Sequence, residues 1–210
     1  MVRSERKQRE FERREEEIIQ AAIELFKRND IPGVTIEQIA EAADIGKGTV
    51  YKHFQSKDEI YARIVMQLNR AMRRDIASID TTLPFRLRLA QIIDVIWQHD
   101  MRDAQFLRRL NYQLMSGNFQ QHLGSEMQQA MHELQEEDNA FYMQLLGEAQ
   151  QRGEIIAGPL EPLLFCTTAA IDGAILFVWQ MEAKGGVSEA EKAVLLEQLK
   201  DFVYRALKSE

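Results

Sequence analysis

Apolar residues recur at helical spacing along almost the whole chain, and this pattern limits the possible folds more than any other feature. The first such stripe is Ile18, Ile19, Ala22, Ile23 and Phe26. Strict alternation of apolar and polar residues, which marks a half-buried strand, is hard to find. Only four prolines occur in 210 residues. The sequence therefore predicts an all-α fold of about nine helices.

Three capping boxes mark helix starts at Thr35–Gln38, Ser56–Glu59 and Ser188–Glu191. In such a box the first side chain accepts a backbone N–H, and the residue three positions later reaches back. The first seventeen residues mix both charges, and they either extend the first helix or lie disordered. We expect helices at about 11–28, 36–42, 47–53, 57–79, 84–99, 104–115, 125–152, 159–183 and 189–207, with an irregular segment at 117–124.

Composition indicates a soluble globular protein. The formal charge is −7, and 45% of the residues are hydrophobic. The longest apolar segment, 163–181, is interrupted by polar residues and is a poor membrane span. The first residues lack the apolar core of a secretory signal, and the single cysteine, Cys166, cannot form an intrachain disulfide. We expect a cytoplasmic protein without membrane contact.

Against this acidic background, the segment 46–57 carries three lysines and no acid. A short helix, a tight turn and a second short helix form the helix-turn-helix pattern. Ala40 supplies a small residue where the helices cross, and Asp44 tolerates the left-handed conformation of the turn. The outer face of the second helix offers groups for phosphates and base edges, and Gly48 permits close approach.

The residues from Ile18 to Val65 resemble the DNA-binding domain of the TetR family of bacterial transcription regulators. The resemblance covers about a quarter of the chain and rests on these segments: Ala21-Ala22, Leu25-Phe26, Gly33-Val34-Thr35-Ile36, Ile39-Ala40-Glu41-Ala42-Ala43, and the run from Lys47 to Ile60. Two positions depart from the family pattern. Asp44 stands where the family usually has glycine, and Gly46 where it often has serine.

This resemblance implies a three-helix DNA-binding domain at 1–55, a linking helix from about 56, and a larger helical domain at 56–210 for effector binding and dimerisation. It implies phosphate contacts for Thr35 and Lys57 at helix starts, where dipole and N–H groups favour anions. The implied DNA-binding set is Thr35, Lys47, Gly48, Thr49, Tyr51, Lys52, His53 and Lys57.

Two parts of that interface have an alternative reading. Tyr51 and His53 either contact phosphate or pack the short helix against its neighbours. The basic residues near the N-terminus either form a minor-groove arm or lie on a solvated tail, because acids are interleaved with them. These basic residues are Arg3, Arg6, Lys7 and Arg9.

Aromatic and methionine residues gather in the second part of the chain. As a group they suggest an apolar pocket, since methionine adapts to irregular ligands. The alternative is an ordinary helical core. The predicted ligand-binding set is Trp97, Met101, Phe106, Tyr112, Met115, Phe119, Tyr142 and Trp179.

Two later helices suit a subunit interface. Small residues let helices approach closely, and the last helix has its own apolar stripe. Two such helices from each subunit form a four-helix dimer interface in the family. The predicted interface residues are Ala169, Gly173, Phe177, Leu199 and Phe202.

We therefore expect a TetR-like repressor that an apolar small-molecule effector releases from a palindromic operator, acting as a homodimer. The alternative is an architectural or accessory DNA-binding factor whose helical domain binds protein partners. An enzyme is disfavoured, because the four histidines lack metal-ligand spacing and no nucleophile–base pair is visible. We expect neither a cofactor nor a metal.

Overall fold

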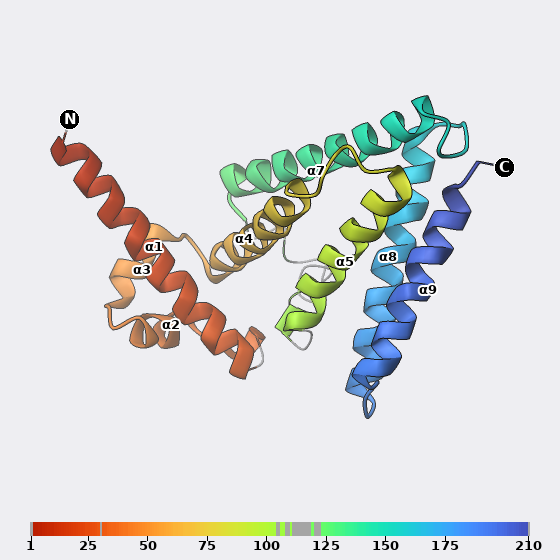
Figure 1. Cartoon of the computed structure of the whole chain (residues 1–210). Helices are drawn as coiled ribbons and strands as arrows, with labels where there is room; N and C mark the ends of the chain where they lie inside the picture. The colour runs from red at the N-terminus through yellow and green to blue at the C-terminus, as the bar shows by residue number, and fades with distance from the viewer. Residues whose placement is uncertain are drawn as a thin grey trace. The chain divides into compact units, whose positions relative to one another are not determined.

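The computed structural model describes residues 2–29, 31–103, 106–107, 110, 119 and 123–209. Within these residues the chain is α-helical, and an isolated bridge between Ile155 and Lys208 is its only strand-like pairing. The predicted all-α fold is confirmed (Figure 1). The helices are α1 (Val2–Arg28), a 3-10 turn η1 (Ile31–Gly33), α2 (Ile36–Ala42), α3 (Lys47–His53), α4 (Lys57–Ala77), α5 (Phe85–Arg102), α7 (Ser125–Gln151), α8 (Leu160–Ala183) and α9 (Glu189–Leu207).

The largest departure from the predicted boundaries is at the start of the chain. Helix α1 begins at Val2 rather than near Phe11, so the charged first residues extend the first helix. Pairs four positions apart support this extension, such as Gln8 with Glu12 at 2.9 Å and Arg13 with Glu17 at 3.2 Å. The helix predicted at 104–115 and the irregular segment 117–124 lie mostly outside the described residues.

Two of the three predicted capping boxes are complete. Thr35 and Ser188 each accept the backbone N–H of the residue three positions later, whose side chain bonds back to the cap. Ser56 makes only half of its box. Its hydroxyl accepts the N–H of Glu59 at 3.1 Å, but the Glu59 carboxylate accepts the N–H of Gln55 at 2.7 Å.

The chain divides into two compact units. The first comprises residues 1–69 and 105–132, and the second comprises residues 70–104 and 133–210. Helices α4 and α7 each contribute residues to both units, so the compact units are divided within these helices. The functional boundary near residue 55 stays a prediction.

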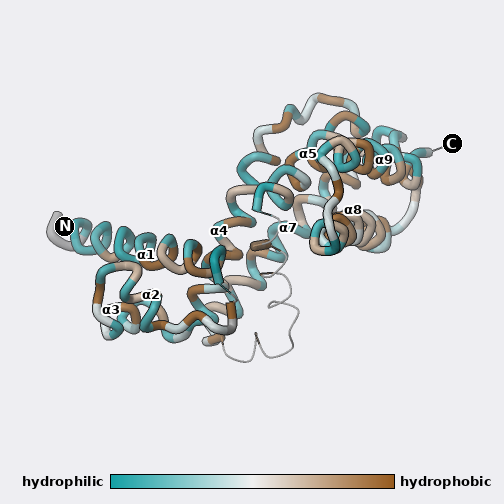
Figure 2. Tube along the Cα trace, turned by 90° about the horizontal axis from the view of Figure 1, so that it is seen from below, coloured by the Kyte–Doolittle hydropathy of each residue, from teal (hydrophilic) through white to brown (hydrophobic). Residues whose placement is uncertain are grey.

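The first unit has a core of aromatic and aliphatic side chains from α1 to α4. Tyr61 lies at its centre: the ring packs edge-on against Phe119 at 5.2 Å and Phe26 at 6.1 Å, and the hydroxyl donates to the carbonyl of Leu110. The early turns of α1 are hydrophilic on all sides, whereas its second half buries an apolar stripe (Figure 2).

The second unit is held by apolar packing and by ion pairs between helices. Helix α9 contacts both α5 and α8. The ammonium of Lys200 lies 2.5 Å from the carboxylate of Asp94 on α5, and Lys192 pairs with Glu182 on α8. Glu154 caps α5 by accepting the backbone N–H of Phe85 at 2.5 Å, where the helix dipole favours a negative charge.

The turn between α2 and α3 determines how the two short helices cross. The N–H of Ile45 donates to the carbonyl of Ala40 at 2.9 Å, and that of Asp44 donates to Glu41 at 3.1 Å. These two bonds form a Schellman motif with Asp44 in the left-handed region at φ 52°. The predicted left-handed residue is therefore in place.

Because most side chains in this region cost about 1–2 kcal/mol and glycine does not, we expect Asp44→Gly to unfold at the same or a higher urea concentration than the wild type. Asp44→Ala should be less stable than the glycine variant by about 1 kcal/mol. Equal stability of the alanine and glycine variants would show that this turn is not under backbone strain.

Candidate nucleic-acid interface

Helix α3 has one buried side and one exposed side. Val50 is fully buried in the core of the first unit. On the other side Lys47, Gly48 and Lys52 are exposed, and Tyr51 exposes 49% of its surface. Thr49 lies half-buried between the two sides. The exposed side of α3 bears cations, a hydroxyl group and an open backbone, which are groups that bind phosphates and base edges.

Glu37 on α2 is an acid beside this surface that sequence reasoning missed. Its carboxylate accepts a hydrogen bond from the Lys47 ammonium, and both side chains are exposed. This hydrogen bond lowers the pKa of Glu37 and raises the pKa of Lys47. The same ammonium lies 5.7 Å from the centre of the Tyr51 ring. A phosphate or a base that bound Lys47 would therefore have to displace the carboxylate of Glu37.

Thr35 begins α2 and is exposed. Its hydroxyl accepts the N–H of Gln38 at 3.2 Å, and its own N–H donates to the Gln38 side chain at 2.8 Å. The capping box thus uses both groups that the phosphate prediction relied on. The N–H groups of the next two residues remain without an intrahelical acceptor, as at every helix start.

His53 packs the short helix instead of reaching outward. Only 7% of its side chain is exposed, and its ring lies 4.1 Å from the ring of Phe11 on α1. Burial lowers the pKa of His53, and the charges of Arg14 and Lys52 add to this effect. This arrangement favours the packing reading of His53 over the phosphate reading.

Lys57 also has a structural contact that the sequence did not reveal. Its ammonium donates to the carbonyl of Val34 at 2.8 Å and to that of Ile31 at 3.2 Å. A charged donor with two backbone acceptors contributes more than an ordinary surface lysine. Lys57 therefore ties α4 to the connector between α1 and α2, and its expected phosphate contact becomes secondary.

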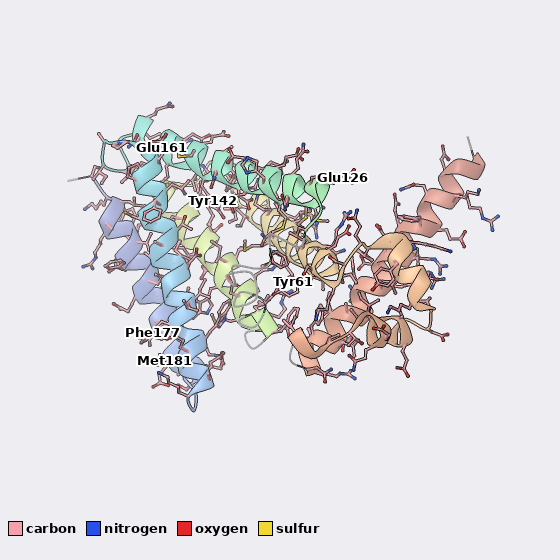
Figure 3. All side chains as sticks on the ribbon, turned by 180° about the vertical axis from the view of Figure 1, so that it is seen from behind. Tyr61, Glu126, Tyr142, Glu161, Phe177 and Met181 are labelled. Carbon is pink, nitrogen blue, oxygen red and sulfur yellow. The ribbon has the colours of Figure 1, made fainter. Side chains whose placement is uncertain are left out.

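The predicted ligand-binding residues are divided between the two units. Trp97 and Trp179 are buried in the second unit, where Met101 and Tyr142 are half-buried (Tyr142 is labelled in Figure 3). Phe106 and Phe119 are buried in the first unit. Tyr112 and Met115 lie outside the described residues. Of the eight residues predicted to line one pocket, four therefore lie together in the second unit.

Two carboxylates lie among these aromatic residues of the second unit. The indole N–H of Trp179 donates to the carbonyl of Asp100 at 3.2 Å. Burial, together with the smaller effect of the nearby negative charge of Asp172, raises the pKa of Asp100 to about 7. Desolvation also raises the pKa of Asp172, and burial raises the pKa of Tyr142 to about 12. Near neutral pH the Asp100 carboxyl can therefore hold or release a proton.

A separate open groove of about 330 Å³ lies along α5 in the second unit. It is mostly polar, and it contains none of the predicted ligand-binding residues. Two of its lining residues are hydrogen-bonded to each other, with Nε2 of His99 2.7 Å from a carboxylate oxygen of Asp75. The lining residues are Asp75, Ser78, Ile79, Gln91, Asp94, Val95, Gln98, His99 and Arg102.

An apolar surface covers parts of α8 and α9. Phe177 exposes 61% of its surface and Phe202 exposes 64%, while a Cβ on Gly173 would meet open space (Figure 3 labels Phe177). Ala169 is exposed on the same helix as Phe177. Leu199 differs, because it is only 8% exposed and packs into the core of its own subunit. Leu199 is therefore withdrawn from the predicted interface.

Helix α8 is also long and apolar enough, by composition alone, to cross a membrane. Only 22% of its most apolar window is buried. Its partners α5 and α9 instead fix it as one helix of the second unit, with an apolar side left uncovered.

The comparisons with known proteins agree with this geometry. Residues 18–64 match the bacterial regulatory proteins of the tetR family. TcmR of Streptomyces glaucescens, an HTH-type transcriptional regulator, is 34% identical over 65 residues, which are 31% of this chain and 29% of TcmR. TtgW of Pseudomonas putida, an uncharacterized HTH-type transcriptional regulator, is 28% identical over 97 residues, which are 46% of this chain and 71% of TtgW.

The fold has close counterparts among solved structures. A crystal structure from Mesorhizobium loti, described as a tetR-family transcriptional regulator, aligns with 95% of this chain and 98% of its own at a TM-score of 0.70 and 21% identity. The segment 18–64 therefore matches the tetR family of bacterial regulatory proteins, and the chain as a whole shares the fold of this solved structure. The match to TcmR nevertheless covers less than a third of that protein's length.

Removal of Glu37 should strengthen DNA binding, because Lys47 loses its competing partner and DNA loses a repelling charge. We expect Glu37→Gln to raise the affinity for duplex DNA about threefold to tenfold and to steepen its salt dependence, measured by fluorescence anisotropy. Glu24→Gln is the matched control, since Glu24 pairs with Arg28 at 3.2 Å on α1. Equal affinities for both variants would mean that Lys47 does not contact DNA.

Proposed function

We propose that this protein is a DNA-binding transcriptional repressor that acts in the cytoplasm as a homodimer. The observation that carries the proposal is the acid-free exposed side of α3 on a chain with a formal charge of −7. A polyanion can approach such a chain only where the local charge is favourable. The family match over residues 18–64 supports the same assignment.

The exposed apolar side of α8 and α9 supports the homodimer. A contiguous apolar surface is uncommon on a soluble monomer and usually marks an interface. Its large exposed residues are Phe165, Leu176, Phe177, Val194, Leu195 and Phe202. A two-fold dimer presents two copies of α3, so its operator should be an approximate palindrome.

A charge within this surface should prevent association, because an unpaired carboxylate is costly to bury. We expect Phe177→Asp to sediment as a monomer at micromolar concentration, where the wild type sediments as a dimer. Leu87→Asp is the control, since Leu87 is 50% exposed on α5, outside this surface. A Phe177→Asp protein that stays dimeric would place the interface elsewhere.

The second unit is the proposed site of an apolar effector. Four aromatic or methionine side chains from three helices support it: Trp97, Met101, Tyr142 and Trp179. An apolar ligand gains from contact with such side chains, and the carboxyl of Asp100 offers a polar group for its orientation. The binding of this ligand is proposed to favour a conformation of α4 that binds DNA less well.

The effector must then lower the affinity for DNA by the same factor by which DNA lowers the affinity for the effector. A compound found by a thermal-shift screen of apolar and aromatic molecules should bind about tenfold more weakly when DNA is present, which corresponds to about 1.4 kcal/mol. The same compound should weaken DNA binding by the same factor, and calorimetry measures both. Identical compound affinity with and without DNA would separate this site from DNA binding.

The alternative function is an architectural or accessory DNA-binding factor whose helical domain binds protein partners. This alternative predicts that the protein binds DNA and that small apolar compounds do not change its melting temperature. The repressor proposal predicts a ligand-dependent shift of that temperature.

A further inference from the structure

The first four turns of α1 lie outside the part of the chain that matches the family. The match begins at residue 18, whereas α1 begins at Val2. The sixteen residues from Val2 to Glu17 span about 24 Å of helix at 1.5 Å per residue. Sequence reasoning left two readings for the basic residues of this segment, a DNA-binding arm or a solvated tail, and the helical structure allows a choice between them.

The contacts of α1 with α3 fix which side of the extension faces the recognition helix. The Phe11 ring stacks on the His53 ring at 4.1 Å, and a carboxylate oxygen of Glu15 lies 4.0 Å from Nδ1 of His53. The charge of Arg14 also acts on His53. The side of α1 that carries Phe11, Arg14 and Glu15 is therefore the side toward α3.

That side continues past Phe11 toward the N-terminus. Residues three and four positions before Phe11 lie on the same side of the helix, and these are Gln8 and Lys7.

The acids nearest Phe11 in sequence are turned away from Phe11 itself, although Glu10 lies three positions after Lys7 and is its neighbour on the helix surface. At 100° per residue, Glu5, Glu10 and Glu12 point about 100° or more away from Phe11. The Gln8 amide reaches Glu12 at 2.9 Å, and Lys7 is exposed. The side toward α3 thus carries residue types that bind phosphate.

The depth of the major groove indicates that the DNA backbone lies near this side of α1 when α3 is inserted in the groove. Helix α3 meets α1 through His53 and exposes Tyr51 and Lys52 away from it. Packed helix axes lie about 8–10 Å apart. The major groove is about 8.5 Å deep, so a helix inserted in it has a phosphate ridge rising beside it by a similar height. Figure 2 shows α1 continuing past α3 toward the N-terminus.

We propose that the first turns of α1 form a second DNA contact, in which Lys7, on the side of the helix toward α3, binds a backbone phosphate that flanks the site read by α3. This inference rests on the proposed DNA binding. Because the contact is made to phosphates, it adds affinity and salt dependence without adding sequence preference. The Phe11–His53 stack gives the contact a fixed position relative to the recognition helix.

Two charge-matched variants separate a direct contact from diffuse attraction. Arg9 lies about 160° from Phe11 around α1 and is exposed like Lys7, so Arg9→Gln removes the same charge from the opposite side. The probe is a duplex recovered from a random-sequence pool with the wild-type protein, and its binding is measured over a range of salt concentrations. Thermal melts of each variant confirm that it folds.

Lys7→Gln should lower the affinity about threefold to tenfold at moderate salt and reduce the salt slope by about 0.9 for each bound arm. Lys7→Arg should restore both values, and Arg9→Gln should leave the slope unchanged. Equal losses in Lys7→Gln and Arg9→Gln, or no loss in either, would overturn the inference. A wild-type protein that binds no duplex would instead refute the proposed function, so the two failures are distinguishable.

Discussion

The Lys57 ammonium joins the first residue of α4 to the connector before α2, and the arrangement of the helix-turn-helix depends on this contact. Its acceptors are the carbonyls of Ile31 and Val34, which the regular helices leave available. Helix α4 contributes residues to both units, and Lys57 holds its first turn against the connector before α2. Tyr61, fully buried one turn later, adds a second anchor in the same unit. Such rigidity is what a spacing-sensitive DNA reader requires.

Charge is distributed so that an acidic protein can still meet a polyanion. The favourable charges are few, and Lys47 already has a carboxylate partner in the free protein. A lysine held by Glu37 binds phosphate only if the new partner is better, which weakens indiscriminate attraction to DNA. Charge placement therefore contributes more to the proposed specificity than total charge does.

Local sequence predicted the features that local chemistry controls. The boxes at Thr35 and Ser188 and the left-handed Asp44 depend on neighbours within five residues, and all three are in place. The side chains of His53 and Lys57 were harder to predict, because their partners lie on distant parts of the chain. The prediction that Leu199 on α9 lies in the dimer interface was wrong for a related reason, because Leu199 is buried. Helix α9 is apolar on two adjacent sides, and its pattern alone does not tell which side faces the core.

The most direct test of the account is selection of duplexes from a random-sequence pool with the full-length protein. The account predicts enrichment of an inverted repeat whose half-sites are centred about 34–36 Å apart, one turn of DNA, and loss of this enrichment in Tyr51→Ala at unchanged thermal stability. A pool that remains random after repeated selection with folded wild-type protein would contradict it.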